Sequence, residues 1–190
     1  MSLRVVSLLL CALLSASLQG CFPVVAAGVG AGVMLAQDRR GRDTLIEDQR
    51  IETAAFQRID RQLKNVMHVN LTSYNHNVLI SGEVPDESTR MEIEKIVSGI
   101  EKVRKVSNEL AVSGNSSLAS RSNDGLITSN VKLRFVNDTR FNAEHIKVVT
   151  ENGTVYLMGI VNRAEAEAAT DVASTTKGVR RVVRMFEYLD

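Results

Sequence analysis

Residues 148–159 read Val-Val-Thr-Glu-Asn-Gly-Thr-Val-Tyr-Leu-Met-Gly, and this stretch predicts a β-hairpin. Before the turn, residues 146–150 alternate in polarity, and after it residues 154–161 are rich in strand-forming residues. Asn152 and Gly153 suit a two-residue type I′ turn, which requires a positive φ at both positions. The sequence therefore predicts two antiparallel strands joined by a tight turn.

The same pattern occurs earlier in the chain. Residues 68–84 align with residues 145–161 without a gap, so that Val78 falls on Val155 and Gly82 falls on Gly159. Ile51 likewise aligns with Ile127. Such self-similarity is typical of a duplicated domain.

The segment between the copies has the composition of a linker. Residues 113–123 are dominated by Ser, Asn and Gly, with few apolar side chains. We therefore expect a first domain over residues 44–113, a linker over 114–121 and a second domain over 122–190.

Each copy has the element order α-β-β-α-β. In the second copy, Ile127, Val131 and Phe135 recur every four residues after an N-cap at Asp124, which predicts an amphipathic helix. Behind the hairpin, residues 163–177 are rich in Ala and Glu and predict a helix that ends before Gly178. Residues 179–189 then predict the last strand.

This order defines an α+β fold. A helix between the second and third strands makes that pair parallel, whereas the hairpin pair is antiparallel. Each of the two tandem modules is therefore expected to be a small mixed three-stranded sheet covered by two helices, with one exposed sheet face. A module of about 70 residues buries a modest core, so packing the two copies on each other would stabilise both.

The N-terminus resembles a bacterial lipoprotein signal. Arg4 precedes an apolar stretch over about residues 5–14, and the small residue Gly20 precedes Cys21. We therefore expect residues 1–20 to be a signal peptide and Cys21 to be the lipidated first residue of the mature chain. Cys11 would leave with the signal, so no disulfide could form within one mature chain.

Two alternatives to this signal are open. The N-terminal stretch could be a membrane-spanning anchor, although Ser15, Ser17 and Gln19 interrupt it before the roughly 20 residues that spanning needs. Cys11 and Cys21 could instead be a pair of structural thiols, which requires both to stay in the product.

Residues 21–43 are expected to form a Gly- and Ala-rich tether behind the lipid. The stretch is glycine-laden and short for a span, which favours a flexible or interfacial segment. Arg39, Arg40 and Arg42 follow it. These side chains either meet anionic headgroups, where each contributes roughly 1 kcal/mol, or belong to a solvated linker.

Enzymatic and nucleic-acid functions are disfavoured. The mature chain has no free thiol nucleophile, and its histidines, His68, His76 and His145, lack metal-ligand spacing, so we expect no catalytic residues, metal, cofactor or small-molecule substrate. Removal of Arg4 from the 23 basic side chains leaves 22 against 22 acidic ones, whereas a protein that follows a nucleic-acid backbone would be basic.

The chain resembles tandem BON domains. The resemblance rests on the αββαβ order, on Gly82 and Gly159, on the Val-rich final strands and on the local sequences at 123–128 and 148–159. Over its whole length the chain is similar to the dual BON-domain outer-membrane lipoproteins of the DolP (YraP) family. The resemblance implies a non-enzymatic periplasmic protein that binds anionic phospholipid through its second domain, concentrates at division sites and supports envelope integrity.

The resemblance also bears on the destination of the chain. In proteins with this type of signal, Asp after the lipidated cysteine usually means retention at the inner membrane, and here that residue is Phe22. The expected location is therefore the periplasmic face of the outer membrane.

The first helix of the second domain holds the candidate lipid-binding residues. On a helical wheel Leu126 and Leu133 lie roughly 100° or more from the core stripe, so they either face lipid or are buried against the first domain. The family's lipid-contacting aromatic aligns with Leu126, which lacks the polar group that suits Trp to an interface, so binding is expected to be weaker or differently tuned. The full candidate set is Leu126, Ile127, Asn130, Lys132, Leu133 and Arg134, with Arg180, Arg181 and Arg184 as further sources of charge.

Two functions of different class are consistent with these features. In the first, the second domain binds an anionic phospholipid membrane and adds a reversible contact to the lipid anchor. In the second, exposed sheet faces or unpaired edge strands bind periplasmic proteins of envelope assembly or division, and lipid serves only as an anchor.

Overall fold

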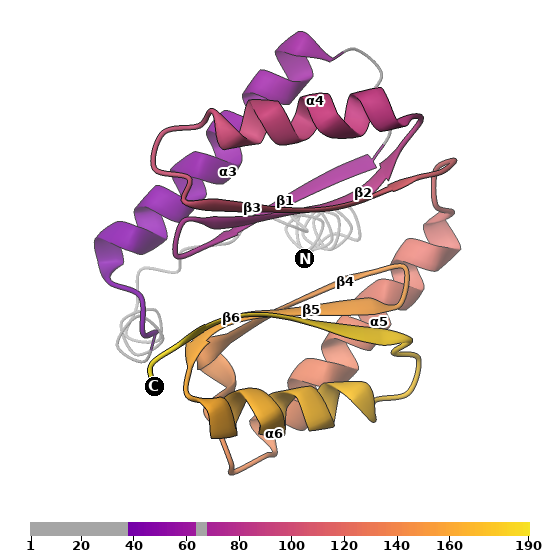
Figure 1. Ribbon diagram of the computed structural model, residues 1–190. Helices are drawn as coiled ribbons and strands as arrows, with labels where there is room; N and C mark the ends of the chain where they lie inside the picture. Colours follow the sequence, from indigo (N-terminus) through magenta and orange to yellow (C-terminus); the bar gives the residue numbers. More distant parts are fainter. Residues whose placement is uncertain (1–37, 64–67) are drawn as a thin grey trace, which may run out of the picture. The chain divides into compact units, whose positions relative to one another are not determined.

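The computed structural model describes residues 38–63 and 68–190 (Figure 1). The expected signal peptide, the lipidation site Cys21 and most of the expected tether lie outside the described residues. Among the residues that are described, no helix is both long and apolar enough to cross a membrane.

The first module has the predicted element order. Helix α3 (Arg42–Gln62) precedes the hairpin of β1 (His68–Tyr74) and β2 (Asn77–Val84), and helix α4 (Glu87–Ser98) leads to β3 (Lys105–Val112). The sheet order is β1-β2-β3, with an antiparallel and then a parallel pair. Both helices lie on the same face of this sheet (Figure 1).

The second module repeats this arrangement. Helix α5 (Leu118–Val136) and a short 3-10 turn (Ala143–His145) precede β4 (Ile146–Glu151) and β5 (Thr154–Val161), and helix α6 (Arg163–Ser174) leads to β6 (Arg181–Tyr188). The sheet order is β4-β5-β6 with the same pairing directions. The predicted α+β class and the two αββαβ modules are confirmed.

Each module has its own apolar core between sheet and helices. In the second module Ile127, Val131 and Phe135 of α5 are buried against Val155 and Leu157 of β5, as the helical period predicted. The first core contains the equivalent α3 side chains, together with alternate residues of β2 and the apolar face of α4. Alternate β2 and β5 side chains thus face the helices, and the side chains between them point to the opposite face of each sheet.

The inner sheet faces are not exposed as expected. Tyr74 and Leu79 of the first module form a buried cluster with Tyr156 and Met158 of the second. Sheets that pack face to face bury the side chains of both inner faces in this way. The expected exposed sheet face is therefore wrong, whereas the packing of the two copies on each other, which the modest core of each module favoured, is present. The inner sheet faces are thus not free to bind a partner protein.

Two buried aspartates tie a helix to each hairpin turn. Asp124 of α5 accepts hydrogen bonds from the backbone nitrogens of Asn152 and Gly153, both at 2.8 Å. Asp48, at the equivalent position of α3, accepts hydrogen bonds from the backbone nitrogens of Asn75 and His76, also at 2.8 Å. Asn152 and Gly153 have the predicted positive φ, 46° and 71°, and Asn75 and His76 in the first turn share it, at 49° and 65°.

The predicted N-cap at Asp124 is therefore wrong. Helix α5 begins at Leu118, and its N-cap is Ser117, whose side chain accepts a hydrogen bond from the backbone nitrogen of Ser120. Residues 118–121 of the expected linker are thus helical. Asp124 lies in the second turn, where its carboxylate serves the hairpin instead of the helix end.

Gly82 of β2 lies against the backbone of His68 in β1. Gly159 of β5 lies against the backbone of His145, just before β4. A Cβ at Gly159 would lie 2.5 Å from the carbonyl oxygen of His145, and one at Gly82 would lie 2.0 Å from that of His68. Gly82 also has a φ of +117°. Both positions therefore exclude a side chain, which explains why the two copies share them.

Candidate functional site

The outward face of α5 carries an unusual set of exposed apolar side chains. Leu118 is 79% exposed, Leu126 65%, Leu133 63% and Val136 73%. At 3.6 residues per turn these four side chains fall within about 80° of one another, opposite the core stripe of the helix. We call them the α5 apolar stripe.

The stripe settles the open question about Leu126 and Leu133. Both are exposed, so burial against the first domain is excluded. Ile127, in contrast, is only 2% exposed and belongs to the core, which removes it from the candidate lipid contacts. Leu118 and Val136 were missed because the predicted N-cap, Asp124, lies seven residues after the observed one, Ser117, and because the exposed face was considered only over the centre of the helix.

Basic residues flank the stripe on α5, and no carboxylate of this helix shares its face. The only acidic residue of α5 is Asp124, which is buried in the turn contact. Asn130 and Lys132 are exposed, and Lys132 forms no ion pair with the residues that the structure describes. Arg134 donates hydrogen bonds to the Val172 carbonyl oxygen and to Thr176 Oγ1, both at 2.7 Å, so its guanidinium also serves the end of α6.

The first module provides an internal comparison for the stripe. Aligning Ile51 with Ile127 places Arg50, Gln57 and Asp60 of α3 at the positions of Leu126, Leu133 and Val136. These α3 side chains are exposed too. Because the same fold accepts polar residues at these positions, the stripe is not a requirement of folding.

Helix α3 does expose two large apolar side chains of its own. Ile46 is 52% exposed and Phe56 is 62% exposed. The same helix also exposes the carboxylates of Asp43 and Asp60. An apolar face without exposed acidic groups is thus a property of α5 and not of α3.

Two of the three arginines considered as headgroup contacts, Arg39 and Arg40, form ion pairs within the protein. Arg39 forms a bidentate ion pair with Glu165 of the second module, with its two terminal guanidinium nitrogens 2.7 and 2.8 Å from the carboxylate oxygens. Arg40 pairs with Asp38 and with the buried Asp48, and its guanidinium lies 3.9 Å from the ring centre of Tyr74. Neither alternative for these side chains, headgroup contact or a solvated linker, predicted such partners, and the contacts fix the start of the folded region.

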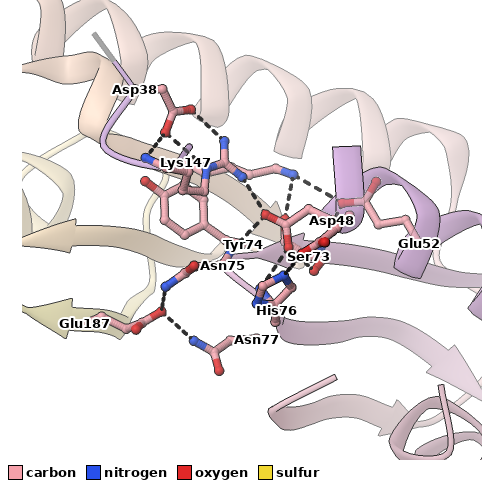
Figure 2. A network of polar contacts seen from close by, with 12 residues as sticks. Asp38, Asp48, Glu52, Ser73, Tyr74, Asn75, His76, Asn77, Lys147 and Glu187 are labelled. Carbon is pink, nitrogen blue, oxygen red and sulfur yellow. Dashed lines mark hydrogen bonds and ion pairs between the residues drawn. The ribbon is translucent and has the colours of Figure 1, made fainter. Parts of the chain in front are cut away.

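Figure 2 shows the polar network around Asp48. Besides the turn nitrogens, Asp48 accepts a hydrogen bond of 2.6 Å from Ser73 Oγ. Lys147 of β4 reaches Glu52 of α3 at 3.3 Å, and Asn75 and Asn77 both donate to Glu187 of β6 at 2.8 Å. Contacts of this kind extend the apolar cluster between the sheets and join the two modules.

A second group of polar side chains lies where β1, β2 and β4 come together. One ligand-type atom from each of His68, Glu83 and Glu151 lies within 4.8 Å of the other two. Asn70 Nδ2 lies 3.2 Å from His68 Nε2 and donates a 2.9 Å hydrogen bond to Glu151. Burial, together with the nearby Glu83, raises the pKa of the Glu151 carboxyl, although Asn70 and His68 oppose this shift.

This cluster differs from the prediction of no metal ligands. The histidine spacing along the chain gave no signal, because the three side chains come from three strands and two modules. His68 and Glu83 face each other across the β1–β2 pair, which the repeat alignment could have indicated. The approach of Glu151 depends on how the sheets pack, and no local pattern encodes it.

Both modules match the family model described as "BON domain", over residues 47–114 and 123–190. The chain belongs to the BON-domain family. It is 38% identical over 175 residues to the outer membrane lipoprotein DolP of Haemophilus influenzae, covering 91% of each chain. The predicted dual-BON architecture of the DolP family is thereby confirmed.

Two further relatives are less similar. The 21 kDa hemolysin of Actinobacillus pleuropneumoniae is 30% identical over 154 residues, covering 80% of this chain and 79% of that protein. The osmotically-inducible protein Y of Escherichia coli is 32% identical over 108 residues, covering 55% and 54%. None of these names denotes an enzyme, and the similarity supports an outer-membrane lipoprotein of the BON family.

Proposed function

We propose that this BON protein is attached to the periplasmic face of the outer membrane by a lipid on Cys21, and that the α5 apolar stripe makes a second, reversible contact with anionic phospholipid. Through that contact it helps to maintain envelope integrity at division sites, as the family resemblance implies. The observation that carries the proposal is the exposed apolar face of α5, which has basic neighbours and no exposed carboxylate.

The size of the apolar contribution follows from the exposure of the stripe. Full burial of a leucine side chain contributes roughly 1.5–3 kcal/mol. Leu126 and Leu133 are 65% and 63% exposed, so each still has about two thirds of that free energy to gain. Leu118 and Val136 add to this, and Lys132 contributes roughly 1 kcal/mol beside an anionic surface.

This sum supports weak binding by the folded region alone. Association costs at least about 4 kcal/mol in lost translational and rotational freedom, which offsets most of the apolar gain. A lipid on Cys21 would hold the stripe near the bilayer, where a tethered contact acts at an effective concentration in the millimolar range. Weak intrinsic affinity is then sufficient for a contact that responds to lipid composition.

Flotation on vesicles tests this proposal. The chain from Gln37 to Asp190 keeps Arg39 and Arg40, whose ion pairs fix the start of the folded region. We expect it to float with millimolar lipid when the vesicles contain phosphatidylglycerol, and to float far less with phosphatidylcholine alone. Replacing Leu126 and Leu133 together by Gln, the residue that α3 carries at position 57, should reduce flotation at least fivefold with an unchanged thermal midpoint.

The first module supplies the matched control. Replacing Ile46 and Phe56 of α3 by Gln removes a similar exposed apolar area from the equivalent helix. This variant should float like the parent chain. Equal loss in both double variants, or no flotation of the parent chain, would refute the proposed α5 contact.

Protein partners of the envelope or of division remain the second candidate function. The buried sheet faces exclude that part of the adaptor hypothesis, so its support is now limited to the edge strands, which are β1 and β3 in one sheet and β4 and β6 in the other. Edge strands present unpaired backbone groups that accept a partner strand. Crosslinking from Ala111 on β3, which is exposed, tests this surface, and a lack of any specific product would contradict it.

A further inference from the structure

The His68–Glu83–Glu151 cluster holds two carboxylates in a buried place. Glu83 is 5% exposed and Glu151 9% exposed. Moving a carboxylate out of water is costly unless hydrogen bonds or an opposite charge compensate it. The surroundings of these two side chains therefore need an explanation.

The protein itself compensates Glu83 poorly. Its only hydrogen bond among the described residues comes from Ser116 Oγ, at 3.2 Å. Arg121 donates to Ser116 and not to the carboxylate. In the part of the chain that the structure describes, no lysine or arginine nitrogen lies within the 4.0 Å ion-pair distance of Glu83 or Glu151, and His68 is the one basic side chain that reaches Glu151, at 3.8 Å.

The repeat shows how the equivalent corner of the second module is arranged. There His145 takes the place of His68, and Ile160 takes the place of Glu83. The carboxylate at that corner is Glu165, which receives the guanidinium of Arg39 at 2.7 Å. One corner thus has a built-in cation, whereas the other has two buried carboxylates and an imidazole.

We propose that His68, Glu83 and Glu151 bind a Zn²⁺ ion that joins the two BON modules. Imidazole nitrogen and carboxylate oxygen are both ordinary zinc ligands, and an imidazole in the set favours a transition ion over Mg²⁺ or Ca²⁺. Three protein ligands leave a fourth position, for which water or the carboxamide oxygen of Asn70 is available after the amide turns.

The geometry is close to that of a zinc site. Ligand atoms about 2.0–2.1 Å from a tetrahedral Zn²⁺ lie roughly 3.3–3.4 Å from one another. In this structure the three ligand atoms lie within 4.8 Å of one another. Side-chain rotations that move these atoms by about an ångström or two would bring them to the spacing of a zinc site. Asn70 Nδ2 lies at hydrogen-bond distance from both His68 Nε2 and Glu151, which places the imidazole nitrogen and the carboxylate of the two modules around one point.

Calorimetric titration with ZnCl₂ tests the site. The chain from Gln37 to Asp190 contains both cores and all the contacts described, and it lacks both cysteines, so thiolate binding cannot contribute. After treatment with a chelator it should bind one Zn²⁺ at low micromolar or tighter affinity, with a raised thermal midpoint that EDTA reverses. Ca²⁺ and Mg²⁺ at the same concentration should give no such shift.

Variants separate this site from surface binding. Glu83→Gln, Glu151→Gln and His68→Asn should each weaken Zn²⁺ binding at least tenfold. His145→Asn at the equivalent corner and His76→Asn beside Glu47 are the matched controls and should bind within twofold of the parent chain. Undiminished binding in the Glu83 and Glu151 variants, or its loss in His145→Asn, would overturn the assignment.

One measurement on the unmodified chain guards against variants that fail to fold. X-ray absorption at the zinc edge should show one imidazole and otherwise nitrogen or oxygen ligands, at about 2.0–2.1 Å. A shell with several imidazoles, or six distant oxygens typical of a solvated ion, would overturn the proposal. The flotation assay does not involve these residues, so either proposal can fail without the other.

Discussion

Replacing Asp124 by Asn distinguishes the two roles that this residue could have in α5. Asn and Asp are nearly equivalent as helix N-caps, so an N-cap would lose only a few tenths of a kcal/mol. In the structure, however, one carboxylate oxygen accepts from the Gly153 nitrogen and the other from the Asn152 nitrogen. An amide side chain has a single acceptor oxygen, so its NH₂ group would face one of these two donors.

The expected loss can be worked from these two hydrogen bonds. A hydrogen bond to a charged group contributes roughly 1.5–3 kcal/mol, and a buried donor left without a partner costs about 1–3 kcal/mol. Asp124 is only 6% exposed, so water compensates little. Asp124→Asn keeps one neutral hydrogen bond and loses the other, and we expect its free energy of unfolding to fall by about 2–3 kcal/mol.

Urea unfolding of the chain from Gln37 to Asp190, followed by far-UV circular dichroism, measures this loss. With a slope of about 2 kcal/mol per molar urea, the midpoint should fall by roughly 1–1.5 M. Ser117→Ala removes the observed N-cap and should cost about 1 kcal/mol, which makes it the matched control. A loss below about 0.5 kcal/mol for Asp124→Asn would refute the turn-closing role.

Two further predictions follow from the strand crossing and from the Arg39 pair. Gly159→Ala places a Cβ 2.5 Å from the His145 carbonyl oxygen and should lower the free energy of unfolding by about 2–3 kcal/mol. Gly125→Ala in α5 meets nothing within 4 Å and should raise it by up to about 1 kcal/mol. Equal effects of the two variants in urea unfolding would contradict this contrast. The hydrogen bond from Arg39 lowers the pKa of the Glu165 carboxyl, so its stabilisation is present above the unfolded pKa of about 4.3 and is lost as the pH falls through the folded pKa. Arg39→Gln should therefore raise the Glu165 pKa in a carboxyl-carbon NMR titration and reduce the acid-induced loss of stability, and an unchanged pKa would show that the pair is not formed in solution.

Periodicity and turn chemistry were sufficient for the fold of each module. The hairpin at Asn152 and Gly153, the parallel third strand and the α5 core stripe all agree with the prediction. These features depend on interactions between residues close in the chain or on the 3.6-residue period of one helix. The gapless alignment of the copies then carried the same assignment to the first module.

The burial of the inner sheet faces was not predicted, although the sequence contains a signal for it. A sheet with one exposed face should alternate in polarity, yet Val155-Tyr156-Leu157-Met158 is apolar throughout, and all four side chains are buried. A continuous apolar run in a strand indicates burial on both faces. The apolar run therefore indicated burial on both faces, in contrast to the general expectation that a small module has one exposed sheet face.

The remaining differences arise from contacts that no local pattern encodes. Asp124 precedes a helical stripe in the sequence and therefore resembles an N-cap, whereas its partners lie 28 and 29 residues away in the turn. Arg39 and Glu165 are separated by 126 residues. Arginines close to a predicted lipid anchor resemble headgroup contacts in the sequence, whereas in the fold Arg39 and Arg40 pair with carboxylates of the protein.

Burial of both inner sheet faces decides where a BON pair of this kind can act. Once Leu79 and Met158 lie in the cluster between the sheets, the extended surfaces left to the modules are their helices and the outer strands. The helices differ where they are exposed: position 50 of α3 is Arg and the equivalent position 126 of α5 is Leu. A duplication can thus keep one copy of a helix polar and make the other apolar, because both share a core that neither change disturbs. Under the proposed function, lipid contact is therefore assigned to α5, and the cluster between the sheets joins its module to that of α3, whose start is fixed by Arg40 and Asp48.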